Sequence, residues 1–471
     1  MRVNIAIAVL AGLALRIFFV LRFPAASSGD SPFYIQLAWN WLKNGIYGAP
    51  VDGRLVPLDT RVPGYPAFLA AVFATAGNSP RAVMLWQVVV DLATCGVIAL
   101  MAARLAPESS RRRAALSALW LAALCPFTAN YTAALLTETL VTFLTALGLL
   151  LVLQACAEPP AWASRPASVR QIFSDPWFLA GIIGGFGALV RPETPLLLLA
   201  AGLAVLTRWW RRADQWKLWR AGLLMGLGLL LPLLPWAARN GRSLGEVQFL
   251  APRYANLPGE WVPRGFNAWT QTWLWRYGHV YLTLWKLEDE PIPPDSIPAR
   301  AFDTPEERDR VRALLERYNE TLTLTPEVDR LFGEIARERT ARHRLRTYVE
   351  IPLLRSLAMW FTPRIELLPF SGHVFPLRSA WEDDREDLII TLLFGFLNGA
   401  YTLLGLAGAW IERGRPGSAL LVLFVLLRTA FFAVFIETPE PRYVLECFPA
   451  VIALAAQVFA RTNQLSSTGS G

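Results

Sequence analysis

Two acidic residues stand beside long apolar segments of this 471-residue sequence. Asp30 follows one apolar stretch and precedes an amphipathic segment, and Glu138 stands at the start of another apolar stretch. A carboxylate at such a position lies between lipid and water, where it can deprotonate a hydroxyl group or hold a polar ligand. A simpler role is open to both, because Asp before Ser-Pro is a good helix N-cap and an acid in the first turn is stabilised by the helix dipole.

Three arginines lie at turns next to apolar segments, namely Arg61, Arg191 and Arg442. A guanidinium group suits a phosphate because its planar fork donates two parallel hydrogen bonds. Arg442 begins a predicted helix, where the dipole disfavours a cation, so we expect an anion nearby. Glu437, Glu440 or the phosphate of a ligand would supply it. Arg191 has an ordinary alternative, a local ion pair with the acid two positions later.

Motifs of nucleotide and metal chemistry are absent from the sequence. It contains no Walker loop, no GxGxxG loop after a strand and no DxD pair, so a nucleotide donor with a bound metal is not indicated. The three histidines (His279, His343 and His373) are too far apart for a His-built metal site. No cofactor is assigned, although Asp30 and Glu138 would hold a divalent cation if the fold brought them together.

The elements that must position these residues are membrane helices. The sequence is 54% hydrophobic and only 17% charged, and its apolar residues gather into blocks long enough to cross about 30 Å of hydrocarbon. The fold class predicted is an all-α polytopic membrane protein. Ten blocks are predicted to cross, at 3–21, 82–103, 114–130, 136–156, 177–190, 193–207, 221–237, 388–411, 417–436 and 443–460. The fifth is short and could be tilted or re-entrant.

The first block contains Arg16, which favours a retained helix packed against other helices over a cleavable signal peptide. Basic residues alternate between the loops, with Arg111 to Arg113 and Arg413 to Arg415 on the N-terminal side. This pattern predicts a multi-pass protein of the bacterial inner (plasma) membrane, with the opposite side facing the periplasm or exterior. It also explains the net charge of +8, so no nucleic acid partner is expected.

Three domains are predicted: an N-terminal transmembrane module over 1–237 with a first external loop at 22–81, an external domain over 238–387, and C-terminal transmembrane helices over 388–471. Thr304 and Thr325 are each followed by Pro and Glu and predict two helix starts in the external domain.

Five tryptophans near the start of the external domain are more than a small domain needs for packing: Trp261, Trp269, Trp273, Trp275 and Trp285. They could stack on a sugar ring or lie on lipid headgroups, and we favour the headgroups.

The sequence resembles membrane glycosyltransferases of the GT-C type, specifically the group related to aminoarabinose transferases and protein mannosyltransferases. Five segments carry the resemblance, at 29–45, 61–66, 135–143, 189–195 and 440–449. It implies a GT-C fold of about ten transmembrane helices with external amphipathic helices and a small, mostly helical external domain. It also implies a donor sugar linked to a polyprenyl phosphate such as undecaprenyl phosphate.

The resemblance also implies roles for particular residues. The family's external acid, a general base, corresponds to Asp30, although Ser31 stands where relatives often have Glu. Glu138 corresponds to a second acid. The residues expected to bind substrate or the lipid phosphate are Arg61, Arg191, Arg442, Tyr34, Tyr65 and Tyr443.

The activity implied is transfer of a sugar from the lipid carrier to a hydroxyl or amine of a glycan, lipid or protein acceptor at the external face, with inversion. A transporter or flippase of lipid-linked sugar is the alternative. Transporters tend to place ionisable residues near the midplane, often in repeated halves, whereas Asp30 and Glu138 gather at one membrane face. A structural or receptor-like scaffold would leave both acids as helix caps only.

Overall fold

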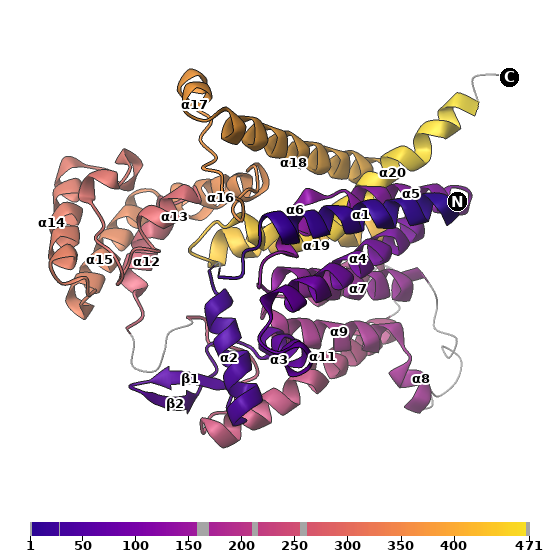
Figure 1. The fold of residues 1–471 in the computed structure, drawn as a ribbon, viewed down its shortest axis with the longest axis horizontal. Coiled ribbons are helices and arrows are strands. Elements are labelled where there is room, and N and C mark those ends of the chain that lie inside the picture. Colours follow the sequence, from indigo (N-terminus) through magenta and orange to yellow (C-terminus); the bar gives the residue numbers. More distant parts are fainter. Residues whose placement is uncertain (1, 28, 158–168, 210–214, 255–260, 468–471) are drawn as a thin grey trace. The chain divides into compact units, whose positions relative to one another are not determined.

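The computed structural model describes residues 2–27, 29–157, 169–209, 215–254 and 261–467. Its described part is almost entirely helical, with one two-stranded sheet (Figure 1). The chain divides into two compact units. The first comprises Met1–Ala255, Pro363–Leu427 and Leu445–Gly471, and the second comprises Asn256–Thr362 and Arg428–Val444. The second unit thus combines part of the predicted external segment with a short segment from the C-terminal region, and its placement outside the membrane stays a prediction.

The first unit contains most of the long helices. Its elements are α1 (Arg2–Arg22), α2 (Ser31–Asn44), β1 (Gly48–Val51), β2 (Arg54–Pro57), α3 (Gly64–Ala76), α4 (Pro80–Leu105), α5 (Arg111–Ala123), α6 (Pro126–Tyr131), α7 (Glu138–Ala157), α8 (Val169–Phe173), α9 (Pro176–Val190), α10 (Leu196–Trp209), α11 (Gln215–Ser243), α17 (Leu377–Asp383), α18 (Arg385–Ile411), the first part of α19 (Pro416–Phe435), and α20 (Phe448–Ser467). Among these, α20 packs on α4, α5 and α18.

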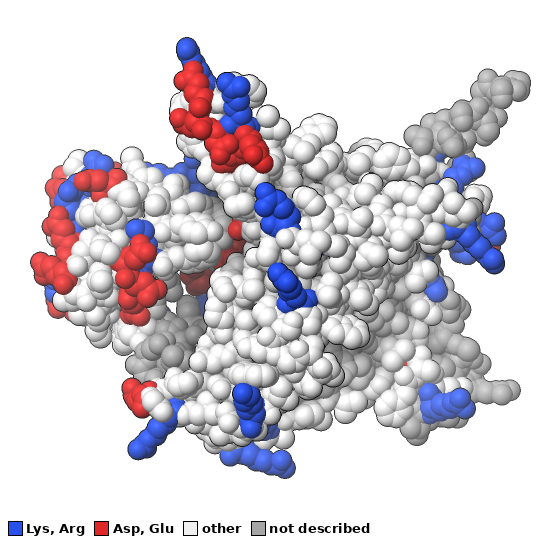
Figure 2. Space-filling model, viewed as in Figure 1, with Lys and Arg blue, Asp and Glu red and all other residues white. Residues whose placement is uncertain are grey.

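Seven helices in the described ranges are long and apolar enough to cross a membrane. They coincide with seven of the ten predicted crossings, and the protein is a multi-pass membrane protein. The other three blocks form shorter helices, because Pro126 separates α5 from α6, and α9 and α10 have 15 and 14 residues. Figure 2 shows that the surface over α1 and α18 carries few charged residues, as expected of a surface in contact with lipid.

The first helix is fixed by a buried charge. Arg16 is fully buried, and its Nε lies 2.7 Å from a carboxylate oxygen of Asp91 on α4. Its Nη1 donates to the carbonyl oxygens of Gly12 and Ala123 at 2.9 and 2.6 Å. Ionisable residues inside a membrane helix face partners in the bundle, so this pair ties α1 to α4 and α5.

A hairpin follows α2. Strands β1 and β2 pair antiparallel, with Gly48 opposite Pro57 and Val51 opposite Arg54. The two-residue turn has positive φ at Asp52 and Gly53, 49° and 76°, which is the geometry that an Asp-Gly hairpin turn favours. The chain then returns to α3 through a segment that contains Arg61.

The second unit is a small helical assembly with its own core. Its elements are α12 (Arg264–Gln271), α13 (Gly278–Leu282), α14 (Pro305–Thr321), α15 (Pro326–Arg342), the π-helix η5 (Arg346–Glu350), α16 (Ile351–Trp360), the last part of α19, and most of the 3-10 helix η6 (Pro441–Cys447). The predicted helix starts are confirmed, because the hydroxyl groups of Thr304 and Thr325 accept hydrogen bonds from the third amide along at 3.2 and 3.3 Å.

The tryptophans of this unit have divided roles. Trp269 and Trp273 are 0% and 1% exposed and lie in the core beside Phe332. The expectation that they lie on headgroups is wrong for these two, because the small unit uses them to fill its interior. Trp261 and Trp285 remain exposed at 45% and 43%.

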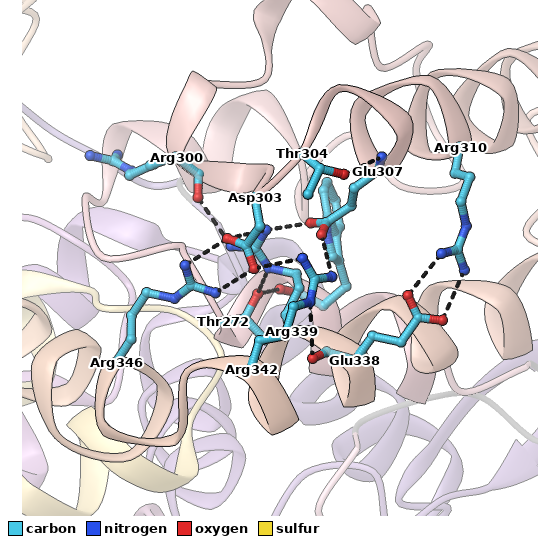
Figure 3. A network of polar contacts seen from close by, with 11 residues as sticks. Thr272, Arg300, Asp303, Thr304, Glu307, Arg310, Glu338, Arg339, Arg342 and Arg346 are labelled. Atoms are coloured by element: carbon cyan, nitrogen blue, oxygen red, sulfur yellow. Dashed lines mark hydrogen bonds and ion pairs between the residues drawn. The ribbon is translucent and has the colours of Figure 1, made fainter.

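A buried ionic network joins α14 to α15 in the second unit (Figure 3). Arg339 is fully buried and bonds to Glu307, which also accepts a hydrogen bond from Arg342 at 2.6 Å. Asp303 accepts from Arg346 at 2.6 Å. Burial raises the pKa of the Asp303 carboxyl, but the hydrogen bond from Arg346 and the charges of the three arginines outweigh it and hold the pKa below its usual value. Three arginines therefore face two acids.

The network predicts that removing the charge of a buried acid and of an exposed acid in this unit has different effects on stability. We expect Glu307→Gln to destabilise the second unit by about 3 kcal/mol, because it leaves the buried Arg339 short of counter-charge. The control is Glu338→Gln. Glu338 pairs with Arg310, and both side chains are nearly half exposed, so this ion pair contributes only about 0 to 1 kcal/mol to stability. Limited proteolysis of the whole protein, with the cuts between α14 and η5 mapped by mass spectrometry, measures the difference. Equal protease sensitivity of the two variants would contradict it.

Candidate active site

Asp30 occupies the N-cap position of α2 but does not act as the cap. Its backbone is helical, with φ −73° and ψ −5°, and its side chain makes no capping hydrogen bond. The carboxylate instead accepts a hydrogen bond from Nη2 of Arg61 at 2.9 Å. The two side chains are 33% and 25% exposed, so their ion pair contributes about 0 to 1 kcal/mol. A ligand can therefore displace it at small cost.

Glu138 belongs to a second, buried cluster. Its Oε1 lies 3.3 Å from Nη1 of Arg191, and Oε1 of Glu446 lies 3.7 Å from the same nitrogen. Glu138 and Glu446 are 1% and 0% exposed, and Thr145 on α7 donates to Glu446 at 3.1 Å. The local pair expected for Arg191 also exists, since its Nε lies 3.2 Å from Glu193. One guanidinium thus faces three carboxylates.

Tyr34 is a buried residue of α2. It is 9% exposed, and its ring packs edge-on against Tyr65 with centroids 5.3 Å apart. Burial raises the pKa of Tyr34 to about 12; the charge of Asp30 adds to this, while the charges of Arg61 and Arg191 oppose it. The charges of Asp30, Arg61 and Arg191 thus all act on the phenol of Tyr34.

Tyr65 has a supporting position. It is fully buried, and its hydroxyl group donates to Oε1 of Gln87 on α4 at 2.8 Å. The amide nitrogen of Gln87 donates to the carbonyl oxygens of Thr132 and Ala134 at 3.1 and 2.7 Å. This chain of bonds holds α3 and α4 against the turn that leads into α7, so Tyr65 positions the site without offering its hydroxyl group to a ligand.

A close backbone contact brings Arg61 toward Arg191. At Gly64 an added Cβ would lie 2.5 Å from the carbonyl oxygen of Leu189 and 2.8 Å from a side-chain carbon of Val190. Only glycine fits there, so α3 begins directly against the end of α9. Arg61 lies three residues before Gly64, and Arg191 lies two residues after Leu189, so both arginines are on segments that adjoin this contact.

An apolar cavity of about 700 Å³ adjoins these segments in the first unit. Three of its lining residues lie close in sequence to charged site residues, since Pro63 follows Arg61, Leu140 follows Glu138, and Val190 precedes Arg191. Phe68, Leu144, Phe186, Pro232 and Trp236 also line it. The cavity is mostly apolar and suits a hydrocarbon chain.

Arg442 and Tyr443 belong to the second unit. Nε of Arg442 lies 2.6 Å from Glu440, so Glu440 supplies the counter-charge expected at the start of this segment. Tyr443 also donates to Glu440, at 2.9 Å, and stacks on Phe432 with centroids 4.3 Å apart. Their predicted contact with a lipid phosphate stays a prediction.

The divalent cation considered for Asp30 and Glu138 stays a prediction. Among the residues that the structure describes, no group of three or more His, Cys, Asp or Glu could hold one. Three glutamates do converge, but on the guanidinium group of Arg191, and Asp30 pairs with a different arginine.

Glu446 was missed by the sequence reasoning. It lies within a 21-residue span, Pro441–Arg461, that is apolar enough to cross a membrane. An acid inside such a span is by itself a signal of a functional or buried partner, and that signal could have found it. Its partner, Arg191, could not be found in this way because the two are far apart in the sequence.

The fold is that of a polytopic membrane protein and is similar to the fold of an oligosaccharyltransferase, in line with the fold that the resemblance predicted. Archaeal oligosaccharyltransferase AglB from Archaeoglobus fulgidus, in complex with an inhibitory peptide and a dolichol-phosphate, matches with a TM-score of 0.52 and 14% identity over 99% of this chain and 51% of its own. At this identity the likeness establishes the fold. The chain thus spans about half the length of that relative.

Two further structures are similar with lower scores. The Archaeoglobus fulgidus oligosaccharyltransferase complex with Zn and sulfate has a TM-score of 0.49 at 14% identity, covering 98% of this chain and 51% of its own. ArnT from Cupriavidus metallidurans bound to undecaprenyl phosphate has a TM-score of 0.41 at 13% identity, covering 99% and 78%. A scan against protein-family models and a search of curated protein sequences found no match.

Proposed function

We propose that the protein is a glycosyltransferase that moves a sugar from a polyprenyl-phosphate carrier to a hydroxyl or amine acceptor at the external face of the membrane. The observation that carries the proposal is a pair of acid–arginine contacts, Asp30 with Arg61 and Glu138 with Arg191, on segments whose residues Pro63, Leu140 and Val190 line an apolar cavity. The GT-C fold and the complexes of its structural relatives with dolichol-phosphate and undecaprenyl phosphate support a lipid-linked donor.

The chemistry proposed is a single displacement. The carboxylate of Asp30 takes the proton of the acceptor group, and the acceptor atom forms a bond to the anomeric carbon. The bond from that carbon to the phosphate oxygen breaks, and polyprenyl phosphate leaves with the electron pair. Arg61 stabilises the growing negative charge of the phosphate. Attack opposite the leaving group inverts the anomeric centre.

The unequal burial of the two clusters suits this chemistry. The weak, partly exposed pair of Asp30 and Arg61 opens when substrate arrives, which frees the carboxylate for the acceptor and the guanidinium for the phosphate. The buried cluster around Arg191 stays fixed and holds α7, α9 and the segment of Glu446 in place.

A panel of donors tests the proposal directly. Purified protein is incubated with labelled polyprenyl-phosphate sugars and with glycan, lipid and peptide acceptors, and both the glycosylated product and the released polyprenyl phosphate are quantified. We expect transfer from at least one donor, with the two products in equal amounts. A folded protein that transfers from none of them, and instead moves a lipid-linked sugar across a vesicle membrane, would overturn the proposal in favour of a flippase.

The cavity predicts a change in donor affinity. We expect Leu144→Trp to raise KM for the lipid-linked donor at least about tenfold with little change in kcat, because the larger ring displaces two or more methylene groups of the polyprenyl chain, each worth about 0.8 kcal/mol. The control is Leu100→Trp on α4, where the native side chain is 57% exposed and does not line the cavity. Steady-state kinetics with a long-chain donor measures the effect. An unchanged KM in both variants would contradict it.

A further inference from the structure

The second unit contains two arginines on one tryptophan. The guanidinium carbon of Arg276 lies 4.7 Å from the ring centroid of Trp275, and that of Arg300 lies 4.8 Å from it. A cation over the face of Trp is stabilised by about 0.5 to 1 kcal/mol at an exposed site. That contact holds each arginine but leaves its charge uncompensated. Both guanidinium groups are thus held against the same ring.

No acid balances these two charges in the described part of the chain, where neither Arg276 nor Arg300 has an ion-pair partner. The nearby Asp303 and Glu307 are occupied by the three arginines of the ionic network. Figure 3 shows the side chain of Arg300 directed away from that network, to which it contributes only its carbonyl oxygen. Within the described residues, Nε of Arg300 is buried and has no hydrogen-bond partner.

His279 completes the group. Its Nδ1 lies 2.6 Å from Nη2 of Arg300, and because arginine can only donate, Nδ1 is the acceptor and the proton is on Nε2. Burial, followed by the charges of Arg300 and Arg276, lowers the pKa of His279 to about 4. The ring is therefore neutral at physiological pH, and Nε2 remains a donor. Every polar side chain of this group then offers donors.

We propose that Arg276, Arg300 and His279 form a binding site for a phosphate group in the second unit. Phosphate fits because it accepts several hydrogen bonds and because guanidinium forks match its oxygens. Arg276 is exposed, while Trp275, His279 and Arg300 are half-buried, so the site is reachable from solvent. The phosphate belongs either to a soluble group, such as a phosphorylated glycan, or to a phospholipid headgroup. The site is independent of the proposed transfer chemistry.

Equilibrium binding of radiolabelled inorganic phosphate to the whole protein in phosphate-free maltoside micelles tests the site. We expect the wild type to bind phosphate in preference to chloride at equal ionic strength, and Arg276→Gln and Arg300→Gln each to weaken binding at least about tenfold. Arg312→Gln is the matched control, because it removes an exposed arginine of the same unit that pairs with Asp295. An equal loss in the control would overturn the proposal.

Chemical footprinting of the histidines distinguishes the two sources. Diethyl pyrocarbonate modifies neutral histidine, and mass spectrometry reports His279 separately from the exposed His343 and His373, which serve as internal controls. Protection of His279 by inorganic phosphate in micelles assigns the site to a soluble phosphate. Protection in phosphatidylglycerol nanodiscs but not in galactolipid nanodiscs assigns it to a headgroup. If neither phosphate nor phospholipid protects His279, the proposal is wrong.

Discussion

Asp30→Asn is expected to lower the rate of sugar transfer by about 100- to 10,000-fold, the usual contribution of a general base. The amide has nearly the same shape as the carboxylate but cannot take the proton of the acceptor. The loss should appear in kcat, because the donor phosphate and the polyprenyl chain are bound by other residues. Single-turnover assays with the best donor found in the panel measure it.

The size of the decrease in transfer rate shows whether Asp30 acts as a general base, as an ion-pair partner or as a helix cap. The ion pair of Asp30 with Arg61 is partly exposed and worth at most about 1 kcal/mol, or about fivefold. A capping role predicts no change, since Asn caps as well as Asp, and the side chain makes no capping bond in any case. Asp52→Asn is the matched control, because Asp52 is an exposed hairpin residue of the same loop and Asn suits its positive φ. If the activity of Asp30→Asn stays within about fivefold of the wild type, Asp30 is not the general base.

Arg191→Met is expected to destabilise the first unit by about 3 to 5 kcal/mol. The substitution keeps most of the side-chain length but leaves Glu138 and Glu446, at 1% and 0% exposure, facing each other without a cation. Removing one partner of a buried ion pair costs this much because the remaining charge is left uncompensated. Thermal unfolding in the same detergent, followed by loss of monodisperse protein, measures it.

Two further variants test whether the uncompensated buried charge causes the destabilisation of Arg191→Met. Arg61→Met removes an arginine from the same site but should cost only about 0 to 1 kcal/mol of stability, because its pair with Asp30 is partly exposed, while transfer falls. Arg191→Met combined with Glu446→Gln should regain part of the lost stability, since one of the two opposed carboxylates is gone. An Arg191→Met protein that unfolds at the wild-type temperature would show that the buried cluster is not the structural anchor described.

The predictions for Asp30→Asn and Arg191→Met depend on which arginine each acid contacts, and the sequence alone did not indicate these pairs. Asp30 before Ser-Pro has the local pattern of a cap, yet its backbone is helical and its carboxylate contacts Arg61 across the 48–57 hairpin. Arg191 has the local pattern of a pair with Glu193, which exists, but two buried glutamates from α7 and from the last span join it. Local patterns describe the nearest partner in sequence only.

The sequence by itself determined that this is a helical membrane protein, because the free energy of placing a block of apolar residues in lipid depends on composition and length alone. It also determined which acids and arginines stand beside those blocks, and the starts of α14 and α15, because helix capping is a local interaction. The tertiary structure decided that Tyr65 bonds to Gln87 and that Glu446 meets Arg191. These outcomes depend on how helices distant in sequence pack, as at Gly64 against Leu189, and packing of that kind is a property of surfaces in three dimensions that no single segment carries.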